Sequence, residues 1–216
     1  MSINNFDPIT IVILLAALSL LPMLLVCTTC FLKVSIVLNI VRNAIGVQQV
    51  PPSIAMYSIA LAVTMFIMAP VAHQISQNFQ AEQRHSNQKV SLEDIAIAVE
   101  PMRRFMTMHT LPEQRAHFLN IARKQWPKAD ADALRDTDYV VLIPAFMISE
   151  LQLAFEVGFV IYIPFVVIDL LMSNVLLALG MQMVSPMVVS LPLKMLLFIM
   201  LDGWNKLIDG LITSYG

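Results

Sequence analysis

The charged residues of this chain are concentrated in one segment, and this concentration constrains the fold more than any other sequence feature. The chain has 13 Lys or Arg and 15 Asp or Glu, and residues 82–138 hold nine of each kind. The flanking blocks are therefore largely apolar and have to be buried in lipid or against protein, whereas the mixed charges face water. We predict hydrophobic helices over 1–72, a polar helical segment over 73–138 and hydrophobic helical hairpins over 139–216.

The composition indicates a membrane protein. Of the 216 residues, 58% are hydrophobic and 13% are charged, against about 25% charged in soluble domains. The net charge of −2 and the lack of a basic stripe give no electrostatic basis for nucleic-acid binding. We therefore predict a membrane-embedded chain with no nucleic-acid partner.

The first apolar block predicts two membrane spans. Residues 8–32 contain no formal charge, and their length exceeds the about 20 residues that a membrane span requires. Residues 54–72 form a second candidate. Lys33 and Arg42 fall between them, and the positive-inside rule places this loop in the cytoplasm and the polar segment on the outer face. Arg42 is interpreted as a solvated loop charge, with a specific contact as the alternative.

The polar segment predicts two helices. Ser91 is a candidate N-cap for a helix that carries Ile95, Val99 and Met102 on one face. A second helix is predicted to begin near Pro112 and to stop before Pro127. The four histidines, His73, His85, His109 and His117, are expected to be ordinary polar or surface residues.

The last block predicts a hairpin of two apolar arms. Gly180, Ser185 and Pro186 indicate a short turn over 180–186, because Gly permits the backbone angles that end a helix and Pro cannot continue one. Each arm carries one charge, Asp169 and Lys194, and counting from the turn places the two within about 4–5 Å in height at about 1.5 Å per residue. We hypothesise that they face each other or share a polar contact; the alternative is that Asp169 lies at a solvated boundary between two short helices.

Carboxylates elsewhere in this block indicate burial against protein. Glu150 and Glu156 lie about 120° apart on a helix, so a lipid-exposed span is unfavourable and a packed oligomer or pore wall is favoured. Asp202 shares a predicted helix face with Lys206 and Asp209, which is typical of a solvated surface. These residues are candidate polar or inter-subunit contacts.

No motif indicates an enzyme, a metal or a cofactor. Cys27 and Cys30 form a CxxC inside an apolar run without further ligands, and they are interpreted as packing residues, with a disulfide as the alternative. HExxH spacing, a phosphate-binding glycine loop and a catalytic triad are absent from the sequence. Ionisable residues in broken apolar helices leave a small-solute or proton-coupled transporter as an alternative function.

Eight short motifs of the sequence match one known family: PAFMISEL at 144–151, AFEVGF at 154–159, IPF at 163–165, DL at 169–170, LALGM at 177–181, SP at 185–186, LDGW at 201–204 and RNAIGVQQVPP at 42–52. In these motifs the sequence resembles the FliP/SctR family of type III secretion and flagellar export-apparatus proteins. The resemblance covers nearly the whole chain outside about 75–138. The sequence GVQQ at residues 46–49 is more similar to the injectisome branch of the family than to the flagellar branch.

The resemblance implies a structural, pore-forming role without catalysis. It implies a homopentamer that joins SctS-like and SctT-like subunits in a helical, ring-shaped export gate, together with SctU-like and SctV-like partners. The gate conducts unfolded secreted proteins across the bacterial inner membrane and is raised toward the periplasmic side. By motif, Met181, Gln182 and Met183 form a gasket that constricts the pore, although relatives commonly carry a third methionine at the position of Gln182.

Overall fold

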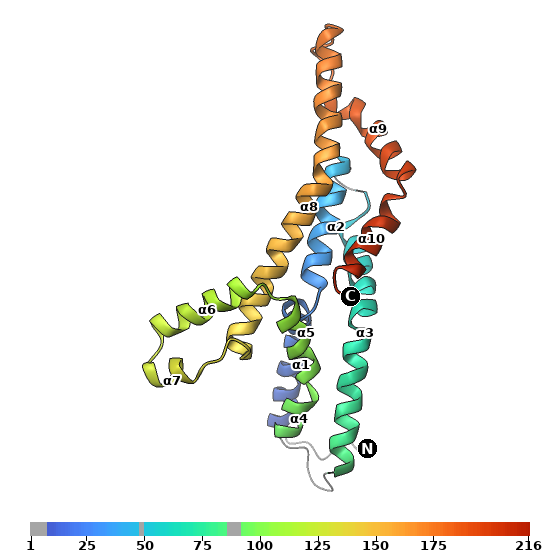
Figure 1. The fold of residues 1–216 in the computed structure, drawn as a ribbon. Helices are drawn as coiled ribbons and strands as arrows, with labels where there is room; N and C mark the ends of the chain where they lie inside the picture. The colour runs from blue at the N-terminus through green and yellow to red at the C-terminus, as the bar shows by residue number, and fades with distance from the viewer. Residues whose placement is uncertain (1–7, 48–49, 86–91) are drawn as a thin grey trace.

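A computed structural model describes residues 8–47, 50–85 and 92–216 of the chain, and these residues form ten α-helices and no strand (Figure 1). The helices are α1 Pro8–Thr28, α2 Phe31–Ile45, α3 Ser53–His85, α4 Leu92–Ala98, α5 Glu100–His109, α6 Pro112–Gln125, α7 Lys128–Ala133, α8 Tyr139–Ala178, α9 Pro186–Met200 and α10 Gly203–Thr213. The prediction of an all-α chain with interrupted hydrophobic helices is confirmed. Prolines lie inside α1, α3, α8 and α9, where each removes a helical hydrogen bond.

Helix α2 lies at the centre of the fold. Val34, Val37, Leu38 and Val41 follow helical spacing and are fully buried, and residues from α3, α8, α9 and α10 complete the same core. The prediction that Lys33 and Arg42 lie in a loop is therefore wrong, because both residues belong to this helix; the cytoplasmic side assigned to them stays a prediction. The apolar stripe between the two charges drives helix burial more strongly than the charges favour water.

The predicted span over residues 8–32 forms a helix as far as Thr28, and the last four predicted residues do not continue it because the chain bends sharply between α1 and α2. The angle between Pro22–Thr28 and Phe31–Ile45 is 82°. The hydroxyls of Thr28 and Thr29 donate to the carbonyls of Leu24 and Leu25 at 2.7 and 2.6 Å. Such back-bonding competes with the backbone ladder and favours helix ends and bends.

Two helices are long and apolar enough to cross a membrane. They are Ser53–Ala81 within α3 and the whole of α8. The bent pair α1–α2 and the bent pair α9–α10, which turns by 59°, each pass the same test when counted together, giving up to four spans in the described residues. Helix α3 continues well beyond residue 72, so the helix is longer than the apolar segment 54–72 from which the span was predicted.

The longest helix, α8, packs along α2 through a glycine. A side chain at Gly158 would overlap Cδ1 of Ile40 and would place its Cβ 3.1 Å from Cγ2 of the same residue. The absence of a side chain therefore lets the two helix backbones approach closely. Beyond this crossing α8 extends away from the other helices except α9 (Figure 1).

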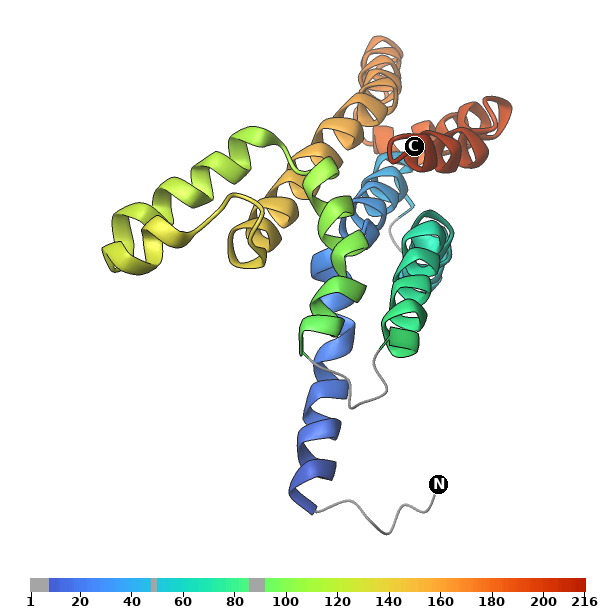
Figure 2. The ribbon, with the colours of Figure 1, turned by 60° about the horizontal axis from the view of Figure 1, so that its bottom comes forward.

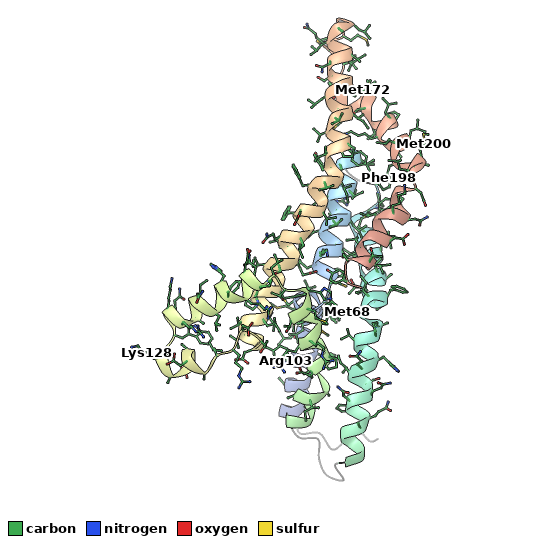
Figure 3. The ribbon with its side chains drawn as sticks, viewed as in Figure 1. Met68, Arg103, Lys128, Met172, Phe198 and Met200 are labelled. Atoms are coloured by element: carbon green, nitrogen blue, oxygen red, sulfur yellow. The ribbon has the colours of Figure 1, made fainter. Side chains whose placement is uncertain are left out.

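The polar segment forms an arm and a short helix pair. Helices α6 and α7 project away from the bundle (Figure 2), with Lys128 at the far end of the arm (Figure 3), and Arg115 pairs with Asp136 at 3.0 Å. The prediction that a helix begins near Pro112 and stops before Pro127 is confirmed.

The first predicted helix of the polar segment is interrupted at Val99, between α4 and α5. Pro101 causes the break because it lacks the N–H that would continue the helix. The proposed N-cap Ser91 and the side chain of His85 lie outside the described residues.

Large apolar side chains remain exposed on several helices, including α1, α8 and α9. The exposed sets are Val12, Leu15 and Leu18 on α1; Phe159, Val160, Leu170, Leu171 and Leu177 on α8; and Val188, Leu196, Ile199 and Met200 on α9. Figure 3 shows Met200 on the outer side of α9, whereas Phe198 lies toward the bundle. Contiguous apolar surface of this kind indicates contact with lipid or with other protein.

Candidate functional site

The turn between α8 and α9 is a helix cap built on glycine. The N–H of Gly180 donates to the carbonyl of Leu177 at 3.0 Å, and the N–H of Met181 donates to Leu176 at 2.9 Å. Gly180 has φ +74°, the left-handed conformation that this paired cap, the Schellman motif, requires. The predicted turn over 180–186 is confirmed, and its last residue, Pro186, begins α9.

The methionines of this turn point into open space. Met183 is 99% exposed and Met181 is 45% exposed, and Gln182 is exposed between them. The described chain provides no apolar partner that covers Met183. Three flexible side chains are thus presented at the tip of the hairpin, and the rest of the fold positions them at a distance from its core (Figure 1).

An ion pair joins the two arms below the turn. Lys194 Nζ lies 2.5 Å from Asp169 Oδ2, and Ser190 donates its hydroxyl to Asp169 Oδ1 at 2.6 Å. The lysine side chain is 4% exposed and the aspartate side chain 37%. The hypothesis that the two charges face each other is confirmed, and the contact lies within one chain.

The same lysine connects the hairpin to the central helix. Lys194 Nζ also donates to the carbonyl of Ala44 at 3.3 Å, which is one of the last carbonyls of α2. A cation at a helix C-terminus is favourable because the final carbonyls lack helical partners. Gly46 caps this end of α2 with φ +90°, so the lysine anchors the hairpin at the C-terminal end of α2.

The other predicted polar residues occupy different environments. Glu150 is 0% exposed, and Glu156 is exposed on the same helix. Arg42 donates to the Ser53 hydroxyl at 3.1 Å, so it makes the specific contact that the sequence left as the alternative. Asp202 has φ +52° and precedes α10, where its carboxylate accepts both hydrogen bonds from Asn205 at 3.0 Å.

This placement corrects the predicted helical face that Asp202 was to share with Lys206 and Asp209. Asp202 lies outside the helix in a left-handed conformation, because the chain turns between α9 and α10. The sequence pattern gave no sign of this turn, so the position of Asp202 became visible only in the tertiary structure.

A second polar cluster was not predicted from the sequence. Lys33, from the start of α2, is 4% exposed and donates to the hydroxyl of Ser214 at 2.9 Å. Glu150, from α8, accepts a hydrogen bond from the hydroxyl of Tyr215. His109 is half-buried and packs its ring against Tyr215 at 5.0 Å between centroids, so of the expected ordinary polar or surface roles it has the polar packing role and not the surface one.

The described residues hold no group of three or more His, Cys, Asp or Glu side chains placed to bind a metal. Cys27 and Cys30 are free, and Cys30 is fully buried. The interpretation as a packing residue is confirmed for Cys30, which belongs to a hydrophobic cluster with Met106, Leu142 and Phe146.

Together these features define a class: an all-α membrane protein whose kinked helices surround a central buried helix and present an exposed methionine turn on a charge-bridged hairpin. The family model for the FliP family matches residues 14–211 of the chain. The chain therefore belongs to the FliP family.

The chain is similar to known secretion proteins over nearly the full length of both sequences. The chain is 52% identical to the harpin secretion protein HrcR of Erwinia amylovora over 216 residues, covering 100% of both chains. It is 54% identical to the harpin secretion protein HrpW of Pseudomonas syringae pv. syringae, over 93% of this chain and 97% of that protein. It is 45% identical to the Yop proteins translocation protein R of Yersinia pestis, over 97% of each. These names describe secretion and translocation proteins, not enzymes.

Proposed function

We propose that this protein is a structural, non-enzymatic subunit of a type III secretion export gate that conducts unfolded protein substrates across the bacterial inner membrane. The carrying observation is the exposed turn of Met181, Gln182 and Met183 at the end of a hairpin that the Asp169–Lys194 pair holds together. Family membership and relatives with secretion functions support the same assignment.

The turn acts as the gasket of the pore. Thioether side chains are flexible and polarisable, so several copies around an axis close over varied surfaces and exclude water from a narrow passage. The glycine cap holds the start of the turn, while the residues after it carry no side-chain anchors among the described contacts. Such a turn can yield to a passing chain while its supporting hairpin stays in place.

The gate is an assembly, with a homopentamer of this chain joined by SctS-like and SctT-like subunits and by SctU-like and SctV-like partners. The exposed apolar faces of α1, α8 and α9 supply surface for these contacts. Helix α8 has 40 residues, about twice the length that a bilayer requires, so part of it contacts protein. The polar segment 73–138 lies on the periplasmic side, toward which the assembled gate is raised.

The test is ion leakage through the assembled complex. The double substitution Met181→Gly and Met183→Gly raises the ion permeability of cells that express all gate subunits, because the apolar constriction is lost. Met108→Gly is the control: Met108 is 74% exposed and lies on α5, away from the turn and outside the apolar faces of α1, α8 and α9. Unchanged permeability with intact assembly in the double variant contradicts the gasket role.

A further inference from the structure

Two buried ionisable side chains whose charged forms have opposite sign lie at the junction of α2, α5 and α8. Lys33 is 4% exposed and Glu150 is 0% exposed. They do not form a direct ion pair with each other; the pairs in the described residues are Arg103–Glu100, Arg115–Asp136 and Lys194–Asp169. Buried charges without partners are strongly unfavourable, so something else must satisfy these two.

The partners of both charges come from residues 214–215, directly after α10. The hydroxyl of Ser214 accepts from Lys33 Nζ at 2.9 Å, and the hydroxyl of Tyr215 donates to Glu150 Oε2. Lys33 Nζ also lies 4.3 Å from the centroid of the Tyr215 ring, within the range of a cation–π contact. One dipeptide therefore serves both the lysine on α2 and the carboxylate on α8.

The same tyrosine reaches the polar segment. Its ring stacks on Phe105 at 5.9 Å and meets His109 at 5.0 Å between centroids, and both partners belong to α5. Burial, and then the negative charge of Glu150, raise the pKa of Tyr215, which keeps its hydroxyl protonated as a donor. Aromatic packing and hydrogen bonding thus join α5 and α8 through a single side chain.

We propose that Ser214 and Tyr215 form a strap that fixes α10 to α2, α5 and α8 by compensating the buried Lys33 and Glu150. The strap couples α10 to α5 of the polar segment, and these two helices are far apart in the sequence. Without it, the buried charges must be hydrated, and α10 is held by its apolar contacts through Leu207 and Leu211.

The competing possibility is that water serves the charges equally well. A cavity of about 240 Å³ beside the strap is lined in part by Lys33, His109, Glu150 and Ser214. Within the described residues, Glu150 Oε1 is buried without a hydrogen-bond partner. A water molecule in the cavity could donate a hydrogen bond to this oxygen. If water in this cavity can replace the strap, its removal changes little.

Hydrogen–deuterium exchange on the purified full chain in detergent distinguishes a strap that is required from one that water can replace. Tyr215→Phe keeps the ring and removes the donor, and it is expected to raise the exchange of the α10 amides at least about tenfold, since a hydrogen bond to a charged group is lost. Exchange in helix α7, at the far end of the arm (Figure 1), should stay unchanged. Tyr162→Phe is the matched control, because Tyr162 is exposed on α8.

Two further variants make the role of the charges explicit. Ser214→Ala is expected to raise the exchange of α10 in the same direction as Tyr215→Phe. In a Lys33→Met and Glu150→Met background, where no buried charge needs a partner, adding Tyr215→Phe should change α10 exchange less than twofold. Exchange of α10 that is equal in Tyr215→Phe and Tyr162→Phe overturns the proposal, as does an undiminished effect in the neutral background.

Discussion

Lys194 and Asp169 lie 25 positions apart in the sequence and 2.5 Å apart in space, on facing arms of the α8–α9 hairpin. The lysine is almost fully buried and also reaches the last turn of α2. One cation therefore closes the hairpin and ties it to the central helix. This arrangement holds the methionine turn at a fixed distance from the core.

The pair should contribute measurable coupling to stability. Asp169→Asn, Lys194→Met and the double variant form a cycle, and we expect a coupling of about 1–3 kcal/mol in the free energy of unfolding in detergent. The more exposed pair Arg115–Asp136 is the control and should give about 1 kcal/mol or less. Additive effects at Asp169 and Lys194 would show that the pair is not an energetic unit.

Gly180 should tolerate asparagine better than alanine. Its φ is +74°, and a side chain there would meet no neighbouring atom within 4 Å, so the cost comes from the backbone alone. We expect Gly180→Ala to destabilise the chain by about 1–2 kcal/mol and Gly180→Asn by less, because asparagine adopts this conformation more readily. Thermal unfolding in detergent measures the order; equal losses would argue against a left-handed cap.

Gly158 and Gly210 should respond to alanine with opposite signs. At Gly158 the added methyl overlaps Ile40, whose β-branched side chain is stiff in a helix, so overpacking should cost about 1–3 kcal/mol. Gly210 in α10 has open space around it, and alanine there should stabilise by about 0.5–1 kcal/mol through helix propensity. Adding Ile40→Ala should reduce the loss caused by Gly158→Ala; no relief would mean that the helices do not meet there.

His109 should contribute a loss of stability in mild acid. Burial and then the positive charge of Lys33 lower the pKa of His109, so the fold favours the neutral ring, whereas the unfolded chain titrates near about 6.5. The unfolded state binds more protons in this window; the contribution of His109 is full above that value and is lost as the pH falls through the folded pKa.

Thermal unfolding between pH 7.5 and 5 measures this dependence. His109→Gln should flatten it, whereas His117→Gln should leave it unchanged, because His117 is exposed. Equal slopes for the two variants would exclude His109 as the source.

Local patterns predicted several elements correctly. The bounds of α6 follow from Pro112 and Pro127, and the hairpin turn follows from Gly180 and Pro186, because glycine and proline restrict backbone angles regardless of the surrounding fold. The similar height of Asp169 and Lys194 along the two arms of the hairpin also followed from the sequence, since the rise per residue of a helix is constant on both sides of a known turn.

The amino-acid sequence by itself determined the helical class, the polar middle segment, the hairpin and its methionine turn. Only the tertiary structure decided that α2 is central, that the chain bends before it, and that Lys33 and Glu150 are compensated by Ser214 and Tyr215. Those contacts span 181 and 65 positions. Periodicity reports which face of a segment is apolar, but it carries no information about which distant segment covers that face, because burial is non-directional.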